Sequence, residues 1–160
     1  MNLDAQWVVG FTDGEGCFHV GIARHAEMTL GVQVLPEFVV VQHERDTHVL
    51  HALKRFFGCG VVRRNHANRM CYRVRKLEHL VQVIVPFFEK HALKTRKQQD
   101  FLVFRDVIRL MNEGGHLTPE GLRRIRELSG RLAKQDERQQ GKVQPSGKPD
   151  GTNRAKFLVR

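Results

Sequence analysis

The chain has 160 residues, of which 41% are hydrophobic, and its 27 lysines and arginines against 17 aspartates and glutamates give a formal net charge of +10 at pH 7. This length suits one domain with a sizeable core, and the composition excludes a membrane-spanning protein because no apolar run approaches the roughly 18 residues that a spanning helix needs. No signal-peptide pattern opens the chain, so we expect a soluble protein, and the surplus of positive charge favours a polyanionic partner.

The first predicted element is a short helix over about residues 4–13. Asp4 is a candidate N-cap, and Gly14 and Gly16 are signals for the end of a helix. Gly10 lies inside this helix, where a glycine costs about 1 kcal/mol relative to alanine. We therefore expect Gly10 to allow the close approach of another backbone.

Two extended segments follow. From Cys17 the hydrophobic period changes to two, with Phe18 and Ile22 on the same face, which predicts a strand. A second extended run covers residues 29–42, and Pro36 inside it predicts either a bulge or a position at the edge of the sheet. The two runs are expected to form an antiparallel hairpin.

A helix and a second hairpin come next. The apolar stripe of residues 47–57 predicts a helix with Asp46 as its N-cap. Residues 61–76 read "VVRRNHANRMCYRVRK" and contain six basic residues and no acid, so the charge is clustered. Alternation predicts a hairpin that turns near "NHAN" (65–68) and presents its basic side chains outward.

The last part of the chain is predicted to be helical. Helices are expected over about 77–85, ending at Pro86, over about 95–111, and over about 119–132. Thr118 as N-cap marks the start of the third. The element order αββαββααα predicts an α+β domain over 1–132, followed by a polar, basic tail over 133–160 that is flexible or partly docked.

The chemistry of the chain centres on the acids of the first helix end. Asp13 and Glu15 lie two residues apart and point in different directions, so they are not expected to chelate one ion together. A single carboxylate with backbone carbonyls and a substrate phosphate is a usual way for a protein to hold Mg²⁺. From the residues alone, a helix-ending turn with incidental acids and a metal site are equally favoured.

A family resemblance decides between them. "VVGFTDGEG" (8–16) resembles a divergent copy of the LAGLIDADG motif of homing endonucleases. The following "CFHVGI", the stretch "GVQVLPEFVVVQHERDTHVLHALKRFFGCG", and the late segments "LKTRKQQDFLVFRDVI" and "HLTPEGLRRI" fit the same family. The resemblance covers about residues 5–132 and implies an αββαββα core, in which an antiparallel sheet forms a saddle with helices on one face and additional helices at the C-terminal end.

The resemblance also implies an assembly, because the family packs the motif helix against its counterpart across a two-fold axis. One motif per chain implies a homodimer, with an interface that includes Val8, Gly10, Phe11 and Asp13. Asp13 is similar to a family position that caps the partner helix. The two acidic helix ends would then lie side by side at the axis.

The implied activity is metal-dependent hydrolysis of one phosphodiester in each strand of a duplex DNA target, which mobilises an intron. Glu15 matches the metal-binding carboxylate, Gly14 would offer a carbonyl to the Mg²⁺ or Mn²⁺ ion, and Gln42 resembles the glutamine that orders active-site water. Lys97, or alternatively Lys94, resembles the basic residue near the scissile phosphate. Arg45, followed by Asp46, is a doubtful match for an arginine that a related enzyme presents after this glutamine.

The two hairpins would present one face to the major groove of the DNA, where arginine reads guanine and asparagine or glutamine reads adenine. The alternative is an inactive member of the same fold that only binds nucleic acid, as a maturase or DNA-binding module. The side chains predicted to contact DNA are His19, Gln33, Glu37, Arg63, Asn65, Arg73 and Arg75.

The cellular compartment stays open. Three cysteines cannot all pair within one chain, which favours a reducing compartment. An excess of arginine over lysine is a weak indication of a bacterial cytoplasm or of an organelle, either chloroplast or mitochondrion.

Overall fold

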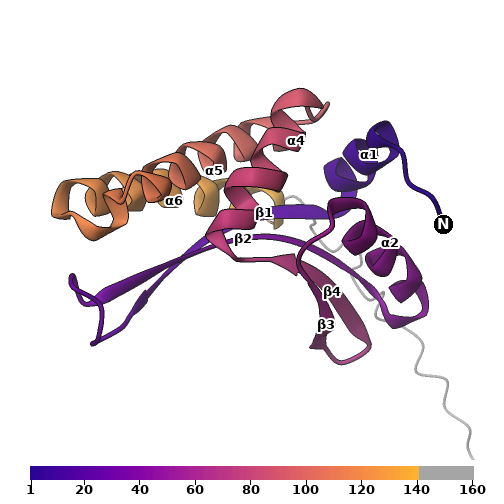
Figure 1. Cartoon of the computed structure of the whole chain (residues 1–160), viewed down its shortest axis with the longest axis horizontal. Coiled ribbons are helices and arrows are strands. Elements are labelled where there is room, and N and C mark those ends of the chain that lie inside the picture. The colour runs from indigo at the N-terminus through magenta and orange to yellow at the C-terminus, as the bar shows by residue number, and fades with distance from the viewer. Residues whose placement is uncertain (141–160) are drawn as a thin grey trace, which may run out of the picture.

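A computed structural model describes residues 1–140, with side chains as far as residue 132. It has the predicted αββαββα core with further helices at the C-terminal end (Figure 1). The tail over 141–160 lies outside the described residues. The helices are α1 (Ala5–Glu15), α2 (Thr47–Phe57), α3 (Leu77–His79), α4 (Val85–Lys90), α5 (Lys97–Asn112) and α6 (Pro119–Gln140), and the strands are β1 (Gly16–Arg24), β2 (Val32–His43), β3 (Val61–His66) and β4 (Arg69–Val74).

The four strands form one antiparallel sheet in the order β1-β2-β4-β3. Pro36 pairs with Val20 of β1, whereas the pairing of β2 with β4 begins only at Phe38. Pro36 therefore lies where β2 is locally an edge strand, which is one of the two predicted alternatives, because a missing N–H costs nothing on an unpaired side.

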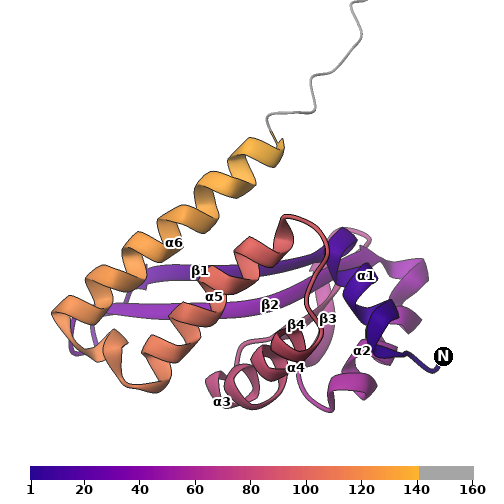
Figure 2. The same ribbon diagram turned by 90° about the horizontal axis from the view of Figure 1, so that it is seen from above.

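The helices cover one face of the sheet and leave the other face of the long β1–β2 pair open (Figure 1). Seen from above, α5 lies over these two strands and α6 runs beside it (Figure 2). The hydroxyl of Ser129 in α6 donates a 2.9 Å hydrogen bond to the carbonyl of Val20, so α6 is also tied to β1.

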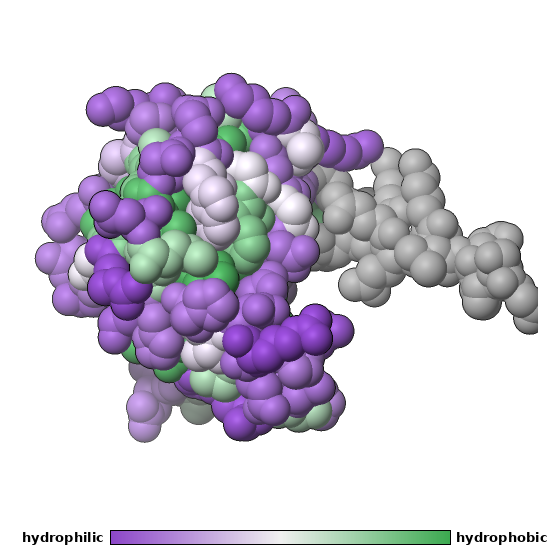
Figure 3. All heavy atoms as spheres, turned by 90° about the vertical axis from the view of Figure 1, so that its right-hand side faces the viewer, coloured by the Kyte–Doolittle hydropathy of each residue, from purple (hydrophilic) through white to green (hydrophobic). Residues whose placement is uncertain are grey.

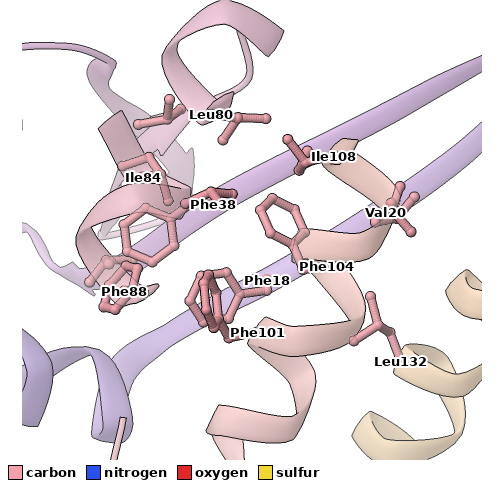
Figure 4. Close-up of a cluster of buried hydrophobic side chains, with 14 of the residues drawn as sticks. Phe18, Val20, Phe38, Leu80, Ile84, Phe88, Phe101, Phe104, Ile108 and Leu132 are labelled. Carbon is pink, nitrogen blue, oxygen red and sulfur yellow. The ribbon is translucent and has the colours of Figure 1, made fainter. Parts of the chain in front are cut away.

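The core between sheet and helices is rich in phenylalanine (Figure 4). Phe18 of β1 lies at its centre, and its ring centroid is 5.2 to 5.5 Å from those of four other phenylalanines. Aromatic rings in edge-to-face or offset contact add to the stability that burial alone provides. These partners are Phe38, Phe88, Phe101 and Phe104.

The predicted break at Pro86 is wrong. The helix continues from α3 into α4 through a π-helical turn, Leu80–Ile84, in which the amide of Val85 donates to the carbonyl of Leu80. The wider turn precedes Pro86, which then occupies the first turn of α4. At that place a proline withholds no hydrogen bond that the helix needs.

Other helix boundaries differ from the predictions in smaller ways. Thr118 caps α6 as predicted, since its hydroxyl accepts a 3.1 Å hydrogen bond from the amide of Gly121. Asp46 precedes α2 but makes no capping hydrogen bond, because a short 3₁₀ turn, Glu44–Asp46, leads into that helix. The helix expected to end near 132 continues to Gln140. None of the helices within residues 1–140 has the length and apolar character needed to cross a membrane.

Candidate active site and nucleic-acid interface

Helix α1 passes into strand β1 without a loop. Glu15 is the last, exposed residue of the helix and Gly16 begins the strand. A Cβ atom at Gly16 would lie 2.6 Å from Cγ2 and 2.9 Å from the carbonyl oxygen of Thr12, so this junction requires glycine. The tight junction fixes Glu15 at the rim of the sheet.

Glu15 lines a hollow of about 200 Å³ together with the end of β2 and the start of β4. The structure thus brings together Glu15 and Gln42, which the sequence predicts as site residues. The remaining lining residues are Val41, His43 and Arg69.

Arg69 is a candidate site residue that the sequence analysis missed. It begins β4 directly opposite His43, and the amide of Glu44 donates a 2.7 Å hydrogen bond to the carbonyl of Asn68. The side-chain nitrogens Asn68 Nδ2 and His43 Nε2 are 2.8 Å apart, which further fixes the start of β4 against the end of β2. The clustered charge of 61–76 includes Arg69, but only the register of β2 with β4 shows that it shares a hollow with Glu15.

Asp13 holds the loop that precedes α5. Its Oδ2 accepts a 2.7 Å hydrogen bond from the amide of Lys94, and its Oδ1 accepts hydrogen bonds of 3.2 and 2.6 Å from the amide and hydroxyl of Thr95. Partial burial raises the pKa of this carboxyl, but the Thr95 and Lys94 hydrogen bonds and the nearby charge of Lys97 outweigh it, so the pKa lies below its ordinary value. Asp13 therefore has a capping role within its own chain, which the sequence did not indicate.

The two candidate lysines occupy different surroundings. Lys97 Nζ donates a hydrogen bond to the carbonyl of Gly16, the residue that follows Glu15. Lys94 is exposed on the loop, and among the described residues only its backbone amide makes a hydrogen bond, to the Asp13 carboxylate. Of the two lysines, Lys97 therefore has its ammonium group at the junction of α1 and β1.

The donor set at the helix end fits half of a divalent-cation site. Glu15 offers an exposed carboxylate, and the space around Gly14 is open, with no atom within 4 Å of a Cβ built there. Over residues 1–132 no three His, Cys, Asp or Glu side chains are grouped to hold a metal. A hard cation such as Mg²⁺ commonly takes one or two protein carboxylates and fills its shell with water and phosphate oxygens.

The open face of the sheet carries most of the predicted DNA-contacting side chains. In the strand register His19 lies opposite Glu37, and Arg63 is exposed on β3. Asn65 falls at a register shift between β3 and β4, so strand alternation does not define its direction. The remaining predicted residues are Gln33 on β2, Arg73 on β4, and Arg75 directly after β4.

Glu37 is an exception, because its predicted exposure to DNA is wrong. It is only 8% exposed, and its Oε2 accepts a 2.7 Å hydrogen bond from Nε of Arg75 and lies 3.2 Å from Nε of Arg73. A carboxylate that is buried in this way is stabilised by its paired cations rather than by solvent. Glu37 therefore contacts the arginines of the face instead of the solvent.

The predicted interface on α1 needs one correction as well. Val8 is fully buried in the core of its own chain, because the helix turns Val8 and Val9 toward the sheet. Gly10 is exposed and Phe11 is half-buried, and the rings of Phe11 and Trp7 stack with centroids 4.7 Å apart. The side of the molecule that carries α1 and α2 shows an apolar area framed by hydrophilic side chains (Figure 3).

Comparison with known proteins identifies the family. The family model described as "LAGLIDADG endonuclease" matches residues 8–108. The solved structure of the homing endonuclease I-TnaI is 51% identical, with a TM-score of 0.79, over 86% of this chain and 99% of that one. I-SmaMI bound to an uncleaved DNA target with calcium ions is 32% identical, with a TM-score of 0.82, over 96% of this chain and 54% of that one.

A curated relative, "Probable intron-encoded endonuclease 2" of Neurospora crassa, is 31% identical over 79% of this chain. The match spans only 26% of that protein's length. With the family model covering more than half of the sequence and the α+β fold shared with I-TnaI, the chain belongs to the LAGLIDADG homing endonuclease family.

Proposed function

We propose that the chain is a site-specific homing endonuclease that hydrolyses both strands of a long pseudo-palindromic duplex target with Mg²⁺ or Mn²⁺ and so promotes intron mobility. The observation that carries this proposal is the meeting of Glu15, Gln42 and Arg69 in one hollow, with the Lys97 ammonium bound to the carbonyl of Gly16, the residue after Glu15. A carboxylate can hold a divalent cation, and fixed cations can stabilise the charge that develops on a phosphate during hydrolysis.

The active assembly is proposed to be a homodimer formed through α1. Its exposed face carries Trp7, Gly10, Phe11 and Gly14, and among the described residues no atom outside the helix's own nearby backbone lies within 4 Å of a Cβ built at either glycine. Such small residues let two helix backbones approach closely. This chain covers 99% of I-TnaI but 54% of I-SmaMI, so the larger relative has room for about one further unit of this size, which supports a two-unit assembly.

Each group has a proposed role at the scissile phosphate. A divalent cation held by the Glu15 carboxylate and the Gly14 carbonyl would stabilise charge on the oxygens of the bond that breaks. Gln42 orients the attacking water through its amide. Lys97 and Arg69 place positive charge near the phosphate, where negative charge develops during the displacement.

The open face of the sheet is proposed to enter the major groove, because a two-stranded ribbon fits that groove. The formal net charge of +10 favours a phosphate backbone, and several basic side chains face the same way. The proposed contacts are His19, Gln33, Arg63, Asn65, Arg73 and Arg75, with Glu37 acting through two of these arginines.

A cleavage selection tests the proposal. A plasmid library that carries candidate intronless sites is incubated with the protein in Mg²⁺ or in EDTA, and the cut ends are sequenced. We expect double-strand cuts at one related set of sites in Mg²⁺ only. Specific binding without cleavage under both conditions would instead support the inactive nucleic-acid-binding alternative.

A further inference from the structure

A second hollow, of about 270 Å³, lies at the β3–β4 end of the sheet. It shares no lining residue with the hollow at Glu15. Strand register places Val61 opposite Arg73, so the wall of the hollow belongs to the open face. Its lining residues are Gly60, Val61, Arg63, Arg73, Arg75, Lys76 and His79.

Glu37 anchors two of the cations in this wall. One oxygen, Oε2, accepts the 2.7 Å hydrogen bond from Arg75 Nε and lies 3.2 Å from Arg73 Nε. The second distance is that of an ion pair, although the Arg73 Nε direction does not meet hydrogen-bond geometry with any described acceptor. Opposite charges 3.2 Å apart, on side chains that are only 15% and 11% exposed, attract each other at any angle.

Both arginines line the hollow, with the Arg75 side chain 51% exposed and the Arg73 side chain 15% exposed. Glu37 engages only the Nε side of Arg73 and Arg75, and their terminal nitrogens have no hydrogen bond to any side chain or backbone group in the described part of the chain. A guanidinium presents five N–H donors in a fixed plane, and two parallel donors match the acceptors of a phosphate or of guanine O6 and N7. The Glu37 carboxylate thus fixes the plane of each guanidinium group while leaving its two terminal nitrogens unbonded.

The hollow remains cationic after its acids are counted. Arg63, Arg73, Arg75 and Lys76 are opposed by Glu37 and by Glu78, whose Oε2 lies 2.7 Å from Lys76 Nζ. Four positive and two negative charges leave a surplus of two with His79 neutral. Glu78 is a surface acid, since its side chain is 52% exposed, whereas that of Glu37 is 11% exposed.

We propose that Glu37 is a positioning residue that orients Arg73 and Arg75 so that this hollow binds an acceptor group of duplex DNA, either a guanine edge or a backbone phosphate. The inference rests on the proposed function, because it needs duplex DNA as the ligand. It replaces direct base contact by Glu37 with an indirect role.

Glu37→Gln tests the proposal, and Glu78→Gln is its matched control because both variants remove one negative charge beside the same hollow. A randomised 30-base-pair duplex library is bound by each protein and the retained sequences are read. Affinities are then measured for the wild-type consensus and a scrambled duplex across a salt series. We expect Glu37→Gln to weaken consensus binding about tenfold or more, and Glu78→Gln to leave it within about threefold.

The two DNA groups give different patterns. If the hollow binds a guanine edge, the Glu37→Gln protein should lose its preference for one guanine in each half-site. Replacing that guanine by 7-deazaguanine should then weaken binding by the wild-type protein to the same extent. If the hollow binds a backbone phosphate, Glu37→Gln should weaken the affinity for consensus and scrambled DNA equally. A methylphosphonate at one backbone position should then weaken binding by the wild-type protein in the same way.

Unchanged or tighter binding by Glu37→Gln, with the same base profile and with Glu78→Gln behaving alike, would overturn the inference. If Glu37→Gln fails to fold by its melting curve, Arg75→Lys decides, because Arg75 is half-exposed and lysine keeps the charge but not the fork. Wild-type consensus binding retained by Arg75→Lys would overturn it as well. If the wild-type protein binds no duplex DNA in these measurements, the result would instead contradict the proposed function itself.

Discussion

The hydroxyl of Thr95 donates a 2.6 Å hydrogen bond to Oδ1 of Asp13, although 82 residues separate them in the chain. This contact joins the acidic end of α1 to the loop that leads into α5. Lys97 lies two residues beyond Thr95 and donates to the carbonyl of Gly16. The first acid of the motif therefore holds the loop that leads to Lys97, whose ammonium group contacts the residue after the second acid.

Asp13→Asn should destabilise the protein by about 1–3 kcal/mol at pH 7, because amide hydrogen bonds to a charged carboxylate are lost or weakened. The pKa of Asp13 is lowered in the folded chain by Thr95 and Lys94 hydrogen bonds and Lys97, against the opposing effect of burial. Its stabilisation is therefore fully present above the ordinary value of 3.8 and is lost as pH falls through the lower folded value. Urea unfolding of both proteins from pH 7 to 3 measures this difference, and a gap that widens toward low pH would contradict the assignment.

Lys97→Met should slow cleavage of bound DNA by roughly 10²-fold or more, the scale of removing one preorganised charge from a transition state. Lys94→Met should stay within about threefold, because the Lys94 side chain lies on the exposed loop. Single-turnover rates at saturating protein compare the two. A larger loss in Lys94→Met would reverse the assignment.

Arg69→Gln should slow the same single-turnover step by about 10–100-fold, since its side chain lines the hollow of Glu15 and Gln42. Its melting temperature should match wild type, because the Arg69 side chain has no hydrogen bond or ion pair to any described residue. Arg64→Gln is the contrasting variant. Arg64 binds Glu44 at 3.2 Å and does not line the hollow, so its loss should lower stability slightly and leave the rate of bound DNA cleavage unchanged. Equal losses of cleavage rate in Arg69→Gln and Arg64→Gln would contradict the role of Arg69 at the scissile phosphate.

Gly10→Arg should prevent dimerisation without unfolding the chain, because Gly10 is exposed and a Cβ there meets no atom within 4 Å. Gly130→Arg in α6 is the matched control, as an exposed helical glycine with equally open surroundings. Sedimentation velocity should show one chain per particle for Gly10→Arg and two for the wild type and the control. A Gly10→Arg protein of dimer mass would show that another surface mediates association.

The motif and the periodicities predicted the element order, the antiparallel hairpins and, as one of two alternatives, the edge position of Pro36, because these depend on local spacing. Contacts between distant segments could not be predicted. Arg69 joined the Glu15 hollow only through the β2–β4 register, and the burial of Glu37 depends on arginines 36 and 38 residues later. The family resemblance places Val8 at the interface because it puts the whole motif helix at a two-fold axis, but it does not show which side of that helix packs on its own sheet.

The metal-binding role of Glu15 is the central claim, and a single measurement tests it most directly. Glu15→Gln and the exposed control Glu113→Gln are compared with the wild type by single-turnover cleavage of the selected target in Mg²⁺, alongside melting temperature and target affinity in Ca²⁺. We predict that Glu15→Gln folds and binds the target but loses cleavage by at least about 10³-fold, while Glu113→Gln cleaves as the wild type does. Mg²⁺-dependent cleavage by Glu15→Gln at the wild-type rate would contradict the account.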